Sequence, residues 1–246
     1  MLPLLWLLAA APAQALTRAQ YVMGTVCEIT AAKPSAVSAA FAEIARWDAI
    51  LSLYKKESQA SRLNASSGRP FPASADLWEA VSLSLRLARA SGGAFDPTVF
   101  SRDGAVGHKK IRLLPDRKVL LPPGASLDFG GIGKGLALDH AARVFKEHGV
   151  SEALINFGGQ IYALGGPWRV AVPGYGELPV KNASVSTSGD CERPGHIVSP
   201  FTGRAVLGPP VTVIAAAGAS ADAWSTALYV LGRSGFFDLR KQKGGL

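Results

Sequence analysis

Asp222 and Thr226 stand four residues apart in the stretch from Ala221 to Leu231, whose pattern predicts a helix. Residues at this spacing lie on one helical face, one turn apart, so a carboxylate and a hydroxyl point the same way. Mg²⁺ prefers hard oxygen ligands and keeps water or phosphate oxygens in its other positions, so the pair suits part of its shell. Two structural readings are also open, because an Asp in a first turn favours the helix dipole and a Thr can bond its own backbone.

Four glycines crowd the start of a second predicted helix. They are Gly130, Gly131, Gly133 and Gly135. They follow a strand predicted at Ser126 to Phe129 and open a helix predicted from about Lys134 to His148. Bare backbone at a helix start lets amide N–H groups face an anion such as a diphosphate. The stretch is not a Walker A loop, because it lacks the earlier glycine and has no Ser or Thr after Gly133-Lys134. It is not Gly-x-Gly-x-x-Gly either, because Leu136 takes the final glycine place. A tight strand-to-helix turn packed on a sheet is the alternative.

The segment Ala94-Phe95-Asp96-Pro97 follows a helix stop. Asp-Pro favours extended or turn geometry, which fixes Asp96 and the backbone around it. Such a loop can hold a nucleotide. The alternative reading places Phe95 in the core of a plain turn.

Polar and charged residues gather between Thr187 and His196, with Ser188 and Arg193 among them. A histidine titrates near neutral pH and can take a proton from a hydroxyl, while a fixed guanidinium can steady phosphate charge. A histidine bonded at the start of a strand, predicted at His196 to Val198, is the alternative.

The remaining histidines, His108, His140 and His148, belong to no motif, and we expect them at the surface or at helix caps. Cys27 and Cys191 lie far apart and form no metal or redox motif, so one disulfide and two unpaired thiols are both open.

The composition is that of a globular protein, with 48% hydrophobic and 18% charged residues. The net charge of +8 suits anionic ligands, including a dinucleotide. Nucleic acid is not an expected partner, since the basic residues are scattered and no zinc-finger spacing or aromatic-basic strip accompanies them.

Residues 1–15 read as a cleaved signal peptide: an apolar core from Leu2 to Ala11 precedes Ala13-Gln14-Ala15, a small-x-small cleavage pattern. The core is too short for a stable membrane span, and no cysteine stands at the cut as in a lipoprotein. We therefore expect that residues 16–246 form a domain that is exported to the periplasm.

Helices and strands alternate along that domain, without repeats. Further helices are predicted at Val37 to Tyr54 and Asp76 to Ala90, and further strands at Ala153 to Asn156, Trp168 to Val172 and Val211 to Ala216. The predicted fold class is α+β, a single compact domain with a mixed β-sheet and packed helices.

Seven short signatures occur in one order along the chain. They are Met23-Gly24-Thr25, Gly93-Ala94-Phe95-Asp96-Pro97-Thr98, Asp128-Phe129-Gly130-Gly131-Ile132-Gly133-Lys134-Gly135, Asn156-Phe157-Gly158-Gly159, Thr187-Ser188-Gly189-Asp190, His196 with Pro200-Phe201-Thr202-Gly203, and Ala221-Asp222 with Thr226. Their order and spacing resemble the ApbE family of flavin transferases. The resemblance covers about Met23 to Gly232, and the stretch between Thr98 and Asp128 is shorter than in relatives.

The resemblance implies an enzyme that moves FMN from FAD to a Thr or Ser hydroxyl of an acceptor redox protein, with Mg²⁺, releasing AMP. It implies Asp222, Thr226 and the carbonyl of Gly131 as Mg²⁺ ligands, His196 or Asp222 as the base, and Arg193 beside the phosphate. The FAD contacts that we expect are Met23, Ala94, Phe95, Asp96, Gly130, Lys134, Thr187 and Ser188. Two alternatives share this site: hydrolysis of FAD to FMN and AMP, and an exported flavin-binding protein without catalysis.

Overall fold

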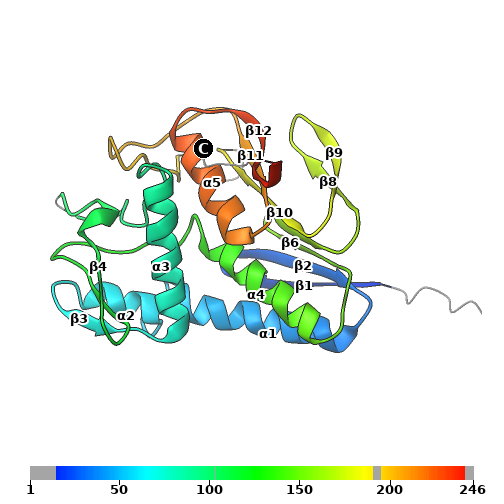
Figure 1. The fold of residues 1–246 in the computed structure, drawn as a ribbon, viewed down its shortest axis with the longest axis horizontal. Helices are drawn as coiled ribbons and strands as arrows, with labels where there is room; N and C mark the ends of the chain where they lie inside the picture. The colour runs from blue at the N-terminus through cyan, green and yellow to red at the C-terminus, as the bar shows by residue number, and fades with distance from the viewer. Residues whose placement is uncertain (1–14, 103, 191–194, 242–246) are drawn as a thin grey trace, which may run out of the picture.

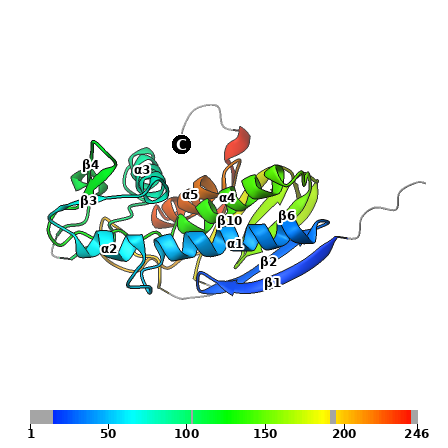
Figure 2. The same ribbon diagram turned by 90° about the horizontal axis from the view of Figure 1, so that it is seen from below.

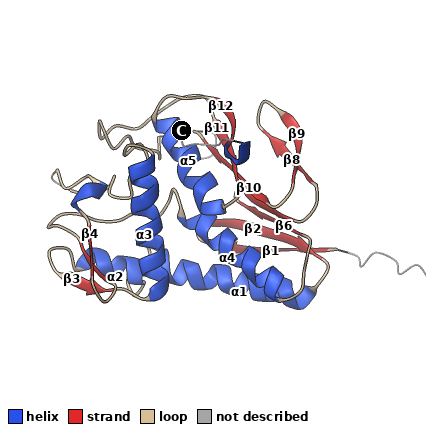
Figure 3. Cartoon of the chain, in the orientation of Figure 1, coloured by secondary structure: helices blue, strands red, loops and turns tan. Residues whose placement is uncertain are grey.

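A seven-stranded sheet forms the centre of the molecule (Figures 1 and 3). The structure is a computed structural model that describes residues 15–102, 104–190 and 195–241. The strand order is β1-β2-β6-β7-β10-β11-β12, and every neighbouring pair is antiparallel except β11 and β12, which are parallel. These strands are β1 (Leu16–Val22), β2 (Thr25–Ala31), β6 (Ala153–Phe157), β7 (Gln160–Leu164), β10 (Ala183–Ser188), β11 (Val211–Ala215) and β12 (Gly235–Asp238).

Three helices cover one face of this sheet, as the two views at right angles show (Figures 1 and 2). They are α1 (Pro34–Leu51), α4 (Gly133–Glu147) and α5 (Gly218–Val230). The other face receives the hairpin of β8 (Trp168–Val172) and β9 (Gly176–Val180), whose Val170 and Val180 join a buried cluster with Val185 of β10. Strand alternation therefore sends even-numbered residues of β10 towards α5 and odd-numbered ones towards the hairpin.

The helical layer forms because its apolar residues repeat at helical spacing. In α1, Pro34 stands in the first turn, where its missing N–H costs nothing, and Val37, Phe41, Ile44 and Trp47 are buried along one stripe. The same core contains Phe145 of α4.

A smaller lobe lies beside the sheet (Figure 2). Its elements are α2 (Gln59–Ala65), β3 (Pro70–Pro72), α3 (Ala75–Ala90), a 3₁₀ turn at His108–Lys110, β4 (Arg112–Leu114) and β5 (Lys118–Leu120), and the loop that contains Phe95 follows α3. A second 3₁₀ turn, at Leu239–Lys241, follows β12 and contacts β11. Serine hydroxyls cap both of its helices: Ser58 accepts from Ser61 N at 3.0 Å and Ser74 from Leu77 N at 3.1 Å.

The α+β fold class and the mixed sheet are confirmed, but two predicted strands are wrong. Residues 126–129 form no strand, because their amides bond across loops: Leu127 N donates to Asn64 Oδ1 at 2.8 Å, and Asp128 N donates to Pro97 O at 2.7 Å. At 196–198 only an isolated bridge forms, from Val198 to Ala205. Among the described residues, no helix has the length and apolar character that a membrane crossing needs.

Candidate functional site

Asp222 lies in the second turn of α5 and is 4% exposed. Its Oδ2 accepts a hydrogen bond from the backbone N–H of Gly135 at 3.1 Å, whereas Oδ1 accepts none within the described part of the chain. Burial raises the pKa of Asp222, and the nearby charge of Lys134 and the Gly135 amide oppose that rise. The structure thus brings a carboxylate with an available oxygen and a half-buried lysine together at the start of α4.

The turn before α4 meets the face of α5 that carries Thr226. A Cβ placed on Gly131 would lie 3.1 Å from Thr226 Oγ1 and 3.3 Å from Phe95 Cε2, so a side chain at position 131 would occupy the space between them. Gly130 is exposed, and its amide donates to Asp128 Oδ1 at 2.7 Å. Segments around residues 95, 131 and 226, far apart in sequence, therefore share one small region.

The other two glycines of the stretch do not offer bare backbone to a ligand, contrary to the sequence interpretation. Gly133 and Gly135 are buried, and a Cβ on Gly135 would lie 2.2 Å from the carbonyl oxygen of Gly218 at the start of α5. None of the four glycines of the stretch has a positive φ. Gly135 is needed because two helix backbones touch there, not because of its conformational freedom.

Asp139 on α4 fixes the start of α5 and was missed at the sequence level. Its Oδ1 accepts from Gly218 N at 2.6 Å and its Oδ2 from Ala219 N at 3.0 Å. It therefore caps a helix 79 residues further along the chain. No local sequence signal marks such a long-range cap.

Met23 lies beside the same turn. It occupies the tight β1–β2 connection with a φ of 48°, and its Cε is 3.5 Å from a Cβ placed on Gly133. Cδ1 of Leu51, the last residue of α1, is also 3.5 Å from a Cβ placed on Gly133. The β1–β2 turn and the end of α1 thus form an apolar wall next to the glycine turn.

Ser188 reaches the site and Thr187 does not. Ser188 Oγ lies 2.8 Å from Ser225 Oγ and 3.4 Å from Thr226 Oγ1. Thr187 points to the opposite face of β10, where its hydroxyl pairs with that of Thr212 at 2.8 Å. Strand alternation separates the two neighbours.

The loop Ala94-Phe95-Asp96 is buried, and Asp96 is bonded within the protein. Its Oδ1 accepts from the amide and hydroxyl of Thr98, at 2.9 and 2.6 Å, and its Oδ2 lies 2.8 Å from both N and Nδ1 of His108. The prediction that His108 lies at the surface or at a helix cap is wrong, because this carboxylate holds the imidazole inside.

His140 is also buried, contrary to the same prediction. Its ring lies 4.5 Å from that of Trp47, and its Nε2 is 3.2 Å from Glu79 Oε1. His148 is the C-cap of α4, as expected. Cys27 is a buried free thiol, whereas Cys191 lies outside the described residues.

His196 is exposed, and its charge helps to lower the pKa of Asp190. The main cause of the lowered pKa is Tyr229, a residue of α5, whose hydroxyl donates a 2.5 Å hydrogen bond to Asp190 Oδ2. Arg193 lies outside the described residues, as does the signal peptide predicted for residues 1–15, apart from Ala15.

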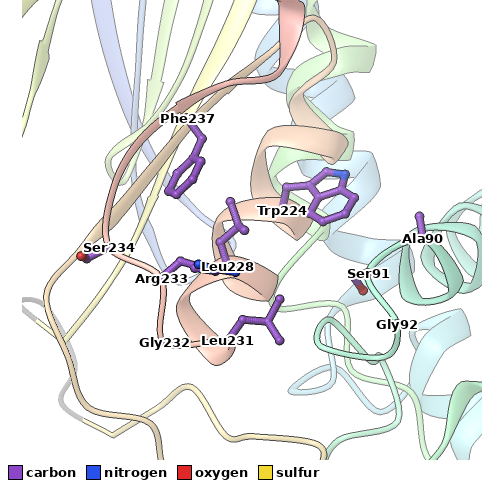
Figure 4. Close-up of a pocket in the computed structure, with 10 residues that line it drawn as sticks. All are labelled: Ala90, Ser91, Gly92, Trp224, Leu228, Leu231, Gly232, Arg233, Ser234 and Phe237. Atoms are coloured by element: carbon purple, nitrogen blue, oxygen red, sulfur yellow. The ribbon is translucent and has the colours of Figure 1, made fainter. Parts of the chain in front are cut away.

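One hollow lies on the far side of α5 from Asp222. It has a volume of about 690 Å³ and is lined by Trp224 and Leu228 of α5 and by Leu231, which follows the helix, together with Phe237 and the end of α3 (Figure 4). At 100° per residue these side chains point away from Asp222 and Thr226. The second hollow, about 320 Å³, lies against Asp96, His108 and Phe201.

The donor set suits magnesium better than a transition metal. In the described residues no group of three His, Cys, Asp or Glu side chains could hold a metal ion. One carboxylate, one hydroxyl and backbone carbonyls remain, all of them hard oxygens, and Mg²⁺ completes such a set with water and phosphate.

Comparisons with known proteins identify relatives along most of the chain. The model of the ApbE family matches residues 23–246. Curated relatives named FAD:protein FMN transferase include one from Escherichia coli K12, 30% identical over 75% of this chain and 68% of its own length. Another, from Treponema pallidum, is 28% identical over 88% of this chain and 78% of its own length.

Solved structures share the fold. The ApbE protein from Thermotoga maritima superposes with a TM-score of 0.81, at 24% identity, over 89% of this chain and 87% of its own. The flavin transferase ApbE from Vibrio cholerae gives 0.78, also at 24% identity, over 90% of this chain and 88% of its own. The family match covers all the described site residues, and this chain therefore belongs to the ApbE family.

Proposed function

We propose that this chain transfers FMN from FAD to a threonine or serine hydroxyl of an acceptor protein, with Mg²⁺ and with release of AMP. The observation that carries the proposal is the meeting of Asp222, Thr226 and the side-chain-free turn at Gly131 in one place. The names of the relatives support the same reaction.

In this reaction the acceptor oxygen bonds to the phosphorus of the FMN half, and the bond from that phosphorus to the oxygen bridging to AMP breaks. The hydroxyl proton passes to a base, and AMP leaves with the bridging oxygen. Bound Mg²⁺ would neutralise phosphate charge, held by Asp222, Thr226 and the carbonyl of Gly131. Such chemistry depends mainly on positioning and charge.

The chain's own groups supply that positioning. Lys134, near Asp222, faces the diphosphate as a fixed cation, and the amides before α4 add the positive end of the helix dipole. Phe95, against Gly131, limits where the dinucleotide can lie. The base is His196 or Asp222, and a pH–rate profile of His196→Gln separates them, because loss of the lower limb identifies His196.

The test combines the chain from residue 16 onward, FAD, MgCl₂ and an acceptor domain with an Asp-x-x-Thr-type site. Covalent flavin fluorescence on the acceptor after denaturing electrophoresis, with equimolar AMP, is the expected result. Release of AMP without a labelled acceptor would identify hydrolysis instead. If neither AMP nor labelled acceptor forms, the chain is a flavin-binding protein without catalysis.

Asp222→Ala should abolish labelling at every Mg²⁺ concentration, whereas Asp222→Asn should retain only a trace. Asp116→Asn is the matched control, since Asp116 is exposed in the β4–β5 turn. Normal labelling by Asp222→Ala would remove the metal assignment.

We also propose that the protein is exported to the periplasm. N-terminal sequencing of the mature protein should then give a sequence that begins at Leu16.

A further inference from the structure

Strand β1 forms an edge of the main sheet, and within the described residues no strand pairs with its outer side. Its five central residues are exposed and only its two end residues are partly buried. In an antiparallel pair, alternate residues point their N–H and C=O groups away from the partner, so about half of the strand offers unpaired groups. Such an edge can accept one further strand.

The edge leads directly to the candidate site. β1 ends at Val22, and the next residue, Met23, approaches the position of a Gly133 Cβ to 3.5 Å. Gly133 is two residues from Gly131. The β1–β2 turn lies near the start of α4, below α5, in Figure 1. An extended segment laid along β1 would therefore run towards the donors of the metal site.

Exposed side chains on this edge indicate what kind of segment fits. Tyr21 and Val26 are cross-strand partners near the turn and are 76% and 50% exposed. Arg18 stands in the middle of β1, where Ser38 of α1 holds its guanidinium at 2.7 Å. The edge thus offers an apolar pair next to the site and a fixed positive charge further away.

We propose that the outer edge of β1 docks the segment of the acceptor protein that carries the reacting hydroxyl. The segment adds to the sheet as an extended strand, with an apolar side chain against Tyr21 and a carboxylate near Arg18. This inference rests on the proposed function. A second copy of the chain is a poorer occupant, because each copy carries a net charge of +8 and like charges repel.

Backbone pairing explains how one enzyme reads a segment with few fixed side chains. Main-chain hydrogen bonds supply affinity whatever the sequence, and alternate side chains add selectivity. Pairing also fixes the register, so the hydroxyl arrives at a set distance from the β1–β2 turn. The edge positions the acceptor and takes no part in the phosphorus chemistry.

The test replaces neighbouring residues of β1 by proline, one at a time, in Ala19→Pro and Gln20→Pro. Of two neighbours, one N–H points to β2 and the other points outward, so the variant that keeps the wild-type melting temperature is the one that lost an outward N–H. That variant should raise the KM for the acceptor domain roughly three- to tenfold, the worth of one hydrogen bond, with kcat and the KM for FAD unchanged.

A matched control comes from β4, an edge strand of the small sheet. The stable member of Arg112→Pro and Leu113→Pro should leave the acceptor KM unchanged. If neither β1 proline variant folds, Arg18→Glu combined with Tyr21→Ser tests the same surface without touching the backbone, and it should raise the acceptor KM at low salt.

An unchanged acceptor KM in the stable β1 variant, or in the side-chain variant when it is needed, overturns the inference while transfer itself continues. A wild-type chain that labels no acceptor overturns the proposed function instead. Sedimentation measurements test whether a second copy of the chain occupies the edge. If the wild-type chain is a dimer and the β1 variant is a monomer, the edge binds a second copy, and this result would also overturn the inference.

Discussion

Gly135→Ala should push α4 away from α5 and damage the fold and the site together. The new Cβ would lie 2.2 Å from Gly218 O and 2.7 Å from Ala219 N, and both atoms belong to backbone, which cannot turn aside. A normal contact needs a separation larger by about 1 Å, and such overpacking costs about 1–3 kcal/mol. The hydrogen bond from Gly135 N to Asp222 and the two from α5 to Asp139 weaken as well, at about 1 kcal/mol each.

Alanine gains up to about 1 kcal/mol in helix propensity, so the net loss should be about 3–5 kcal/mol. For a chain of this size, that lowers the melting temperature by about 6–20 °C in differential scanning calorimetry. Gly131→Ala is the control: its Cβ meets side chains at 3.1 Å or more, so it should melt within about 3 °C of wild type while Mg²⁺-dependent labelling falls. A Gly135→Ala variant that melts like wild type would show that the two helices do not touch there.

Three further predictions concern groups outside this contact. Asp139→Ala should lower the melting temperature by about 2–6 °C, since two amides at the start of α5 lose their acceptor; an unchanged value would deny the cap its role. Burial raises the pKa of Cys27 to about 12, so in a Cys191→Ser background its thiol should stay protonated and unreactive towards Ellman's reagent at pH 9 until the chain is denatured; rapid labelling of the native chain would contradict its burial. Arg46 holds the pKa of Glu43 below its ordinary 4.5, so the stabilisation is complete above that pH and is lost as pH falls through the lowered value. The stability difference between wild type and Arg46→Met should therefore shrink as the pH falls below 4.5, and a constant difference would count against the pair.

Local pattern sufficed for the four longest helices, α1, α3, α4 and α5. The spacing of Val37, Phe41 and Ile44 predicted α1 to within three residues at each end, because burial of an apolar stripe dominates helix formation. The four-residue spacing of Asp222 and Thr226 likewise needed only helical geometry. The edge strand β1 went unpredicted, since its seven residues are mostly exposed and carry no alternation of apolar and polar residues.

Other features depend on long-range contacts that no local pattern contains. Gly135 was interpreted as part of an anion-binding turn, whereas its neighbour in space is Gly218, 83 residues away in sequence. His108 lacks a motif because its partner, Asp96, belongs to another loop. Thr187 and Ser188 looked equivalent until the two faces of β10 separated them.

The contact between Gly135 and Gly218 also explains why a buried carboxylate is tolerated at position 222. It brings the amino-terminal ends of α4 and α5 together, so the positive ends of two helix dipoles face one small region. Lys134 adds a full charge there. Burial raises the pKa of Asp222, and these positive groups oppose that rise in the region where we propose that a diphosphate binds. The close helix contact is therefore the element on which both the proposed metal donors and the proposed anion site depend.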